Sequence, residues 1–125
     1  MNVVGSEKNF ENKVKDFLKE KNCWFLKTWS NGVQRSGVPD ILACFGGHFL
    51  GIELKAPNGK PSELQIYNLG EIHKSGGYAI LLYPKDFELF KKLVCGLDGR
   101  DVQQVIEAYL HFDRLRKEWE KRLGL

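Results

Sequence analysis

Residues 39–55 read PDILACFGGHFLGIELK, two runs of apolar and aromatic residues separated by a pair of glycines. Adjacent glycines readily adopt the positive φ angles that a tight hairpin turn requires. The pattern therefore predicts two antiparallel strands joined at Gly46–Gly47, with Phe45 and His48 as the residue pair that flanks the turn. This hairpin sets the register of every residue on both strands.

Counting back from the turn places three charged side chains on one face of the hairpin. Asp40 lies directly opposite Glu53, and Lys55 shares their face because side chains alternate along a strand. Directly opposed residues have Cβ atoms roughly 4.5 to 5.5 Å apart. Two carboxylates at this separation repel each other unless a cation lies between them. We therefore expect a metal site with an ammonium group beside it.

Each of these residues has an ordinary explanation when it is taken alone. An Asp after Pro often marks the entry to a strand, and Glu-Leu-Lys is common on a solvated edge. Here, however, apolar residues occupy both faces of the hairpin, which predicts burial on both sides, as in α/β folds. One face carries Ile41, Ala43, Leu50, Ile52 and Leu54, and the other carries Leu42, Cys44 and Phe49. Charges at the end of a buried hairpin need a partner.

The same residues resemble a known nuclease signature. Pro39-Asp40 followed by Glu53-Leu54-Lys55 is similar to the PD-(D/E)-x-K motif, and the longer run SGVPDILACFGGHFLGIELKAPNGKPSELQ resembles the small VRR-NUC domains, many of them phage-encoded. The likeness covers about residues 6–84. It implies a restriction-endonuclease-like αβββαβ core, in which helices flank a mixed sheet. The implied activity is Mg²⁺-dependent hydrolysis of phosphodiester bonds in DNA, with Mn²⁺ as a substitute ion.

The resemblance also assigns roles to individual residues. Asp40 and Glu53 would hold the metal together with the main-chain carbonyl of Leu54, and Mg²⁺ usually takes one or two carboxylates in an octahedral shell of oxygens. Lys55 is commonly regarded as the general base of such sites. An ammonium beside two carboxylates keeps its proton, however, so we expect Lys55 to orient the attacking water and to stabilise transition-state charge.

Glu11 is a candidate outer metal ligand. The residues alone favour an i,i+4 ion pair with Lys15 on an exposed helix face. The resemblance adds a second interpretation, because related nucleases carry a glutamate on their first helix that reaches the water shell of the metal or a second ion. Glu7, one turn earlier, is the rival for that role.

Four further residues are expected to lie near the metal. Gln65 can complete an S-x-x-Q capping box with Ser62, and the resemblance also places a glutamine here that lines the active site. Lys60, Arg35 and Ser36 are positioned by the sequence to meet phosphates of a nucleic acid. Each of the two basic residues has the alternative of being a solvated loop charge.

The remaining pattern predicts one domain over residues 1–125. We expect helices over about 6–21, 62–74, 86–94 and 101–123, strands at 24–29 and 78–83, and a break at 96–99. The strand at 78–83 should lie parallel to the Glu53 strand, because a helix connects them. The two C-terminal helices form an extension to the core. The last helix has an apolar stripe, Val102, Val105, Tyr109, Phe112, Trp119 and Leu123, for packing against its own domain or, alternatively, for a dimer contact.

Composition permits these expectations without adding to them. Nineteen Lys and Arg against sixteen Asp and Glu give a net charge of +3, too small to identify a nucleic-acid-binding protein by itself. No apolar run has the length of a membrane span or a signal peptide, and the three cysteines lack metal or disulfide spacing, so we expect a cytoplasmic protein, in the host cell if phage-encoded.

The resemblance favours structured or branched DNA such as Holliday junctions as the substrate, and a homodimer as the form that cuts them. Two rivals remain open from the sequence. One is a non-catalytic nucleic-acid-binding or assembly module with the nuclease fold, and the other is an RNA-directed nuclease.

Overall fold

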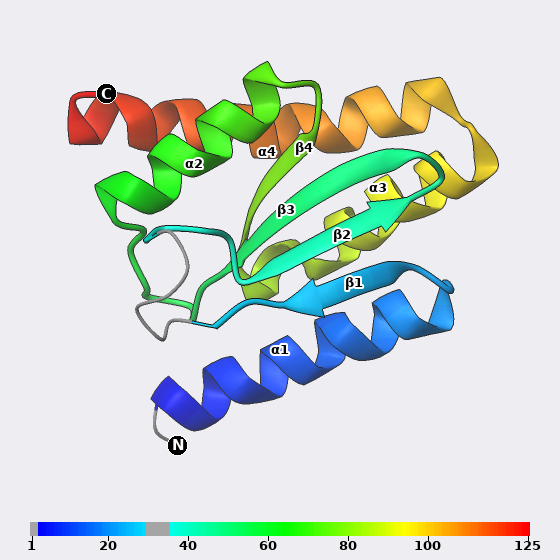
Figure 1. Ribbon diagram of the computed structural model, residues 1–125, viewed down its shortest axis with the longest axis horizontal. Helices are drawn as coiled ribbons and strands as arrows, with labels where there is room; N and C mark the ends of the chain where they lie inside the picture. The colour runs from blue at the N-terminus through cyan, green and yellow to red at the C-terminus, as the bar shows by residue number, and fades with distance from the viewer. Residues whose placement is uncertain (1–2, 30–35) are drawn as a thin grey trace.

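The computed structural model describes residues 3–29 and 36–125 as an α/β fold with a four-stranded mixed sheet and flanking helices (Figure 1). Side chains are described from residue 7 onwards in the first helix. In chain order the elements are α1 (Val3–Glu20), β1 (Trp24–Lys27), β2 (Ile41–Phe45), β3 (His48–Leu54), α2 (Glu63–Lys74), β4 (Tyr78–Leu82), the 3₁₀ helix η1 (Pro84–Asp86), α3 (Phe87–Gly99) and α4 (Val102–Leu123). The predicted αβββαβ order is therefore confirmed over the first two thirds of the chain.

The strands lie in the order β1-β2-β3-β4. The first two pairs are antiparallel, and β4 runs parallel to β3, as the crossover through α2 predicts. Phe45 pairs with His48, and Ile41 pairs with Ile52, so the predicted hairpin register is confirmed. The two turn glycines, Gly46 and Gly47, have φ angles of 58° and 84°. Asp40 directly precedes β2, opposite the position of Glu53.

The main core lies on the face of the sheet that α1 and α3 cover. Phe10 and Phe17 of α1 make edge-on ring contacts with Phe87 and Phe90 of α3. Fully buried side chains from every layer complete this core, among them Val14, Leu18, Ile41, Ala43, Leu50, Ile52, Phe90, Leu93, Val94 and Phe112. The two C-terminal helices are thus part of the core and not an appendage to it, because their largest apolar side chains fill its centre.

The opposite face is covered only in part. α2 and α4 pack over β4, where Ile66, Leu69, Ala79 and Leu81 form a second cluster. Elsewhere on this face, Trp24 of β1 is 62% exposed, Phe49 of β3 is 44% exposed, and Cys44 of β2 is exposed as well. The hairpin was expected to be buried on both sides. This expectation is wrong for this face of the sheet, because no described helix crosses it near β1 and β2 (Figure 1).

Two predicted boundaries need correction. α1 begins at Val3 and not near residue 6. α3 runs through the predicted break to Gly99, and the chain turns at Arg100, whose φ is 53°. A Cβ on Gly96 would lie 3.0 Å from Val105 Cγ2 on α4. This glycine is present for close helix packing, which the sequence does not distinguish from a helix end.

The apolar stripe of α4 packs against its own domain, as the sequence favours. Val105, Tyr109 and Phe112 contact the main core, and Trp119 and Leu123 contact the second cluster. Val102, the first residue of the predicted stripe, is the exception at 69% exposed. Among the described residues, no helix is long and apolar enough to cross a membrane.

Candidate metal centre

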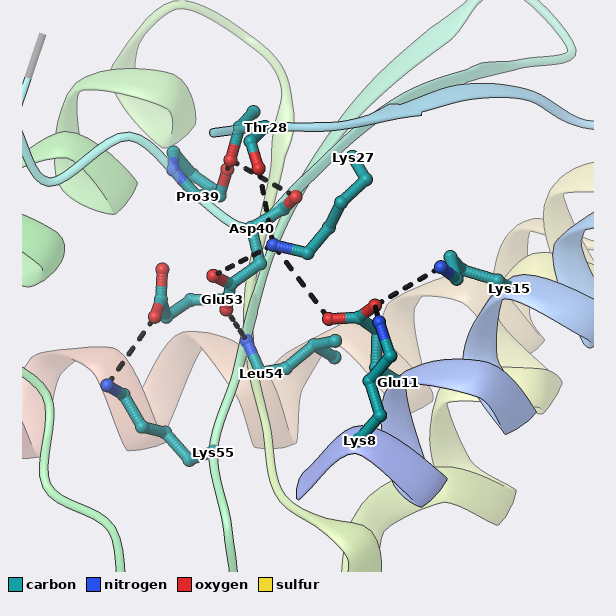
Figure 2. Close-up of polar contacts among 10 residues, drawn as sticks. All are labelled: Lys8, Glu11, Lys15, Lys27, Thr28, Pro39, Asp40, Glu53, Leu54 and Lys55. Atoms are coloured by element: carbon teal, nitrogen blue, oxygen red, sulfur yellow. Dashed lines mark hydrogen bonds and ion pairs between the residues drawn. The ribbon is translucent and has the colours of Figure 1, made fainter. Parts of the chain in front are cut away.

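The loop that leads into β2 is held to the end of β1 by Thr28. The Thr28 backbone N–H donates to the Asp40 carbonyl at 2.8 Å, and its hydroxyl donates to the Pro39 carbonyl at 2.8 Å. A threonine at this point therefore fixes the backbone on both sides of the Pro39–Asp40 peptide. Figure 2 shows the Asp40 side chain pointing from this anchored backbone toward the end of β3.

The two oxygens of Asp40 have different surroundings. Oδ2 accepts a hydrogen bond from the Leu54 backbone N–H at 2.8 Å. Oδ1 lies 3.8 Å from the Lys27 ammonium, an ion pair that is partly exposed on both sides. One oxygen is thus tied to the sheet, and the other faces the site and is weakly paired.

Glu53 is the most unusual charged residue of the site. It lies in the interior of the fold, 2% exposed, and its Oε1 is buried without a hydrogen-bond partner. Oε2 lies 3.5 Å from the Lys55 ammonium. Burial, followed by the nearby charge of Asp40, raises the pKa of Glu53 from its usual 4.5 to about 8, although Lys55 acts in the opposite direction. A carboxylate in this position is costly unless a cation accompanies it.

These residues fit a divalent cation of the Mg²⁺ type. The buried Glu53 Oε1 lacks a partner, and Asp40 supplies a second carboxylate beside it. Within the described parts of the chain, no cluster of three or more His, Cys, Asp or Glu side chains is arranged to hold a metal. Mg²⁺ does not need such a cluster, because it usually retains several waters and takes only one or two carboxylates. The donor set is hard oxygen, which disfavours zinc.

Glu11 lies close to this site, but ammonium groups surround it. Its Oε2 is 3.1 Å from Lys15 and 3.2 Å from Lys8, and its Oε1 is 3.8 Å from Lys27. Burial raises the pKa of Glu11, but hydrogen bonds from Lys15 and Lys8 outweigh it and hold the value below 4.5. The predicted Glu11–Lys15 pair is confirmed. The helix face is not exposed as expected, because the Glu11 side chain is only 13% exposed. The rival Glu7 lies partly exposed one turn earlier.

Lys27 is the residue that the sequence did not single out. It ends β1, and its ammonium lies between Glu11 of α1 and Asp40 (Figure 2). In that view Lys27 and Lys55 approach the two carboxylates from opposite sides. The available signal is slight: Lys27 is the charged end of the otherwise apolar strand WFLK. Its meaning depends on strand pairing and helix packing that the sequence alone does not give.

The remaining predicted residues lie at the margins of the site. Gln65 completes the capping box: its Oε1 accepts from the Ser62 backbone N–H at 2.9 Å, and its own N–H donates to Ser62 Oγ at 3.2 Å. Its role in lining the site stays a prediction. Ser36 is exposed, and its carbonyl accepts a hydrogen bond from Asn68 at 3.3 Å. Lys60 is exposed at the loop after β3. Arg35 lies outside the described residues.

Comparisons of the chain with protein-family models, with curated proteins and with solved structures give no match. The case for a function therefore depends on the site itself. Its chemistry is a buried, partnerless carboxylate oxygen, a second carboxylate anchored by a main-chain N–H, and an ammonium on each side. Such a site can hold one divalent cation and can place fixed positive charge against a bound anion.

Proposed function

We propose that this protein is a Mg²⁺-dependent endonuclease of the PD-(D/E)-x-K class that hydrolyses phosphodiester bonds in DNA. The observation that carries the proposal is the buried Oε1 of Glu53, which has no hydrogen-bond partner and lies beside a second carboxylate. A fold keeps such an arrangement at a cost in stability, so the arrangement implies a bound cation. The hairpin register and the parallel β3–β4 pair support a restriction-endonuclease-like core.

The metal would be held by Asp40 Oδ1, Glu53 and, as the resemblance implies, the Leu54 carbonyl. When bound, Mg²⁺ supplies Lewis-acid stabilisation of the phosphate charge and a more acidic water. The protein supplies the rest. The Leu54 N–H fixes the Asp40 carboxylate, and burial of Glu53 keeps bulk water away from one side of the site.

Lys55 is best suited to orient the attacking water and to stabilise the negative charge that develops on the phosphate. Its side chain is only 15% exposed, and its ammonium lies 3.5 Å from Glu53 Oε2. A positive charge fixed beside the phosphate stabilises the transition state more than the ground state. Lys27 provides a second fixed positive charge beside Asp40.

The direct test is a cleavage assay with labelled four-way, flap, single-stranded and linear DNA and with RNA, each in Mg²⁺, Mn²⁺ or EDTA. Asp40→Asn is the inactive variant, and Asp98→Asn is its matched control because Asp98 is exposed on α3. We expect metal-dependent cutting by the wild type and by Asp98→Asn, and none by Asp40→Asn. Cutting in EDTA, or equal cutting by both variants, would refute the proposal.

The same assay separates the rivals. Binding of DNA without cutting in either metal would favour a non-catalytic nucleic-acid-binding or assembly module. Cutting of RNA alone would favour an RNA-directed nuclease.

Structured DNA such as a Holliday junction, cut by a homodimer, is the more specific form of the proposal. Two cuts across a four-way junction require two sites related by symmetry. A protein that remains monomeric when it is bound to a junction would exclude this form and leave the nuclease activity itself intact.

A further inference from the structure

A polar concavity lies next to the candidate metal centre. It has a volume of about 370 Å³ and is formed between the loop after β3, the η1 helix and the C-terminal half of α4. Three cationic side chains line it, Lys60 from the loop, Lys85 from η1 and Arg122 from α4. We refer to these three residues and the space between them as the basic pocket. Of the three, only Lys60 is predicted from the sequence to meet phosphates.

The charge of the basic pocket is not neutralised from within. In the described part of the chain, none of its three cations forms an ion pair. By contrast, ion pairs engage Lys27 and Lys55 at the metal centre. Two acidic residues also line the pocket. Asp86 is buried, and its Oδ2 lies 3.2 Å from His111 Nε2 without a hydrogen bond to it, whereas Glu118 is exposed. Three cations thus face two carboxylates. The pocket therefore presents an excess of positive charge to a ligand.

The walls of the basic pocket support Arg122 and the loop that carries Lys60. The Arg122 guanidinium lies over the Trp119 ring, 5.0 Å from the ring centroid, an arrangement that orients the planar group at little cost in hydration. On the loop side, the Tyr83 hydroxyl donates a 2.7 Å hydrogen bond to the Gly59 carbonyl. The loop that carries Lys60 is thus attached to the end of β4.

The basic pocket adjoins the stem of Lys55 through Gly59, which lines the pocket. A Cβ on this glycine would lie 3.4 Å from Lys55 Cδ, so one side of the residue contacts the stem of Lys55. Its carbonyl faces Tyr83, which lines the pocket. The stem of the candidate catalytic lysine thus packs against the back of the pocket wall at Gly59. An extended anionic ligand with one group at the metal centre can place its next groups in the pocket.

We propose that the basic pocket binds the sugar-phosphate backbone of the nucleic-acid strand whose scissile phosphate lies at the metal centre. A chain of phosphates is the ligand that suits three cations beside a site that is proposed to bind a phosphate. The identity of the ligand rests on the proposed function, whereas the existence of a polyanion site rests on the pocket alone. Lys85 and Arg122 are thereby assigned as substrate-binding residues that take no part in the chemistry.

The test measures binding without cleavage. Fluorescence anisotropy with a labelled single-stranded and a labelled duplex DNA, in EDTA, compares the wild type with two double variants of equal charge change. One is Lys85→Glu with Arg122→Glu. The matched control is Lys92→Glu with Lys121→Glu, because both of these lysines are exposed on α3 and α4 and neither lines the pocket. Lys121 is the direct neighbour of Arg122 in the helix.

We expect the pocket variant to bind DNA at least tenfold more weakly than the wild type and the control variant to stay within about threefold. The slope of log affinity against log salt should fall by about 2 in the pocket variant, because two phosphate contacts are lost. Thermal unfolding monitored by circular dichroism verifies that both variants are folded. If the pocket variant does not fold, Lys85→Gln with Arg122→Gln against Lys92→Gln with Lys121→Gln answers the same question.

Equal weakening in the two double variants would overturn the proposal, because it would show an effect of net charge alone. So would an absence of DNA binding by the wild type, or competition by polyglutamate at the same charge concentration as DNA, which would point to an acidic protein. Failure of this proposal can be distinguished from failure of the proposed nuclease activity. Pocket-dependent binding without cleavage refutes only the enzyme, and cleavage with no effect of the pocket variant refutes only the basic pocket.

Discussion

The backbone N–H of Leu54 donates a 2.8 Å hydrogen bond to Oδ2 of Asp40. This bond joins the residue before β2 to the last residue of β3, beyond the Ile41–Ile52 pair that ends the hairpin ladder. It fixes the rotation of the Asp40 carboxylate, so that its second oxygen remains on the side of the site. The bond needs an oxygen acceptor at this position but does not need its negative charge.

Replacing Asp40 by Asn separates these two roles. The amide oxygen of Asp40→Asn can still accept from Leu54, so we expect the thermal midpoint of the metal-free protein to change by only a few degrees. The loss of a carboxylate should lower the affinity for Ca²⁺, used as a non-cleaving substitute, by about 100-fold or more. Calorimetric titration measures the affinity. Unchanged Ca²⁺ binding would show that Asp40 is not a ligand.

Glu53 should destabilise the metal-free fold as pH rises. Its pKa is raised from 4.5 to about 8 by burial and by Asp40, so between these values the folded protein holds a proton that the unfolded chain has released. Stability is therefore highest below about pH 4.5 with respect to this group, and it falls by at most about 5 kcal/mol as the pH rises through 8. Urea unfolding in EDTA should show this slope in the wild type and a flatter one in Glu53→Gln. Parallel profiles of stability against pH in the wild type and in Glu53→Gln would contradict the raised pKa of Glu53.

Metal affinity should depend on pH through the same residue. A cation binds ionised Glu53, so protons compete with it below the raised pKa of about 8. We expect the apparent Ca²⁺ affinity to rise about tenfold per pH unit from pH 6 and to level off above about pH 8. Titrations across this range measure it. An affinity that is constant between pH 6 and pH 8 would place the metal elsewhere.

The role assigned to Lys55 predicts a difference between its substitutions. Lys55→Arg keeps the positive charge near Glu53 and should retain the cleavage rate within about tenfold. Lys55→Met should lose about 100- to 1,000-fold, because a charge that stabilises the transition state is gone. Ca²⁺ titration provides the control, since neither substitution removes a ligand. An inactive Lys55→Arg enzyme with normal metal binding would favour a general base, and loss of metal binding in both would contradict the assigned role.

Lys27 should weaken metal binding in the wild type. Its ammonium lies 3.8 Å from Asp40 Oδ1 and repels a cation held there. The pair is partly exposed, so solvent screens it, and we expect Lys27→Met to raise the Ca²⁺ affinity by only about fivefold. Lys13→Met is the matched control, because Lys13 is exposed on α1. Weaker binding in Lys27→Met would mean that Lys27 holds the site in shape.

The hairpin and its register could be predicted from the sequence because they depend on local chemistry. Two glycines at a turn fix the pairing of Phe45 with His48. The alternation of side chains along each strand then determines which residues share a face. The position of Asp40 opposite Glu53 follows from this count alone. The capping box of Ser62 and Gln65 is local in the same way, and it too was confirmed.

The features that the sequence did not reveal depend on contacts between distant segments. Lys27 becomes part of the site only because β1 pairs with β2 and α1 packs so that Glu11 reaches it. The burial of the hairpin was overestimated because the coverage of a sheet depends on where helices lie and not on strand composition. Gly96 was misread since a glycine that ends a helix and one that allows close packing look alike in a sequence.

The way in which α3 and α4 enter the core sets the smallest unit that can carry this site. Phe90, Leu93 and Phe112 are fully buried against Ile41, Leu50 and Ile52 of the hairpin itself. A fragment that ends after β4 would leave this apolar face in water and would lose most of the burial that holds the hairpin flat against the fold. The charged hairpin therefore cannot be transferred alone to another protein. Its new scaffold would have to supply helices that cover the same apolar face.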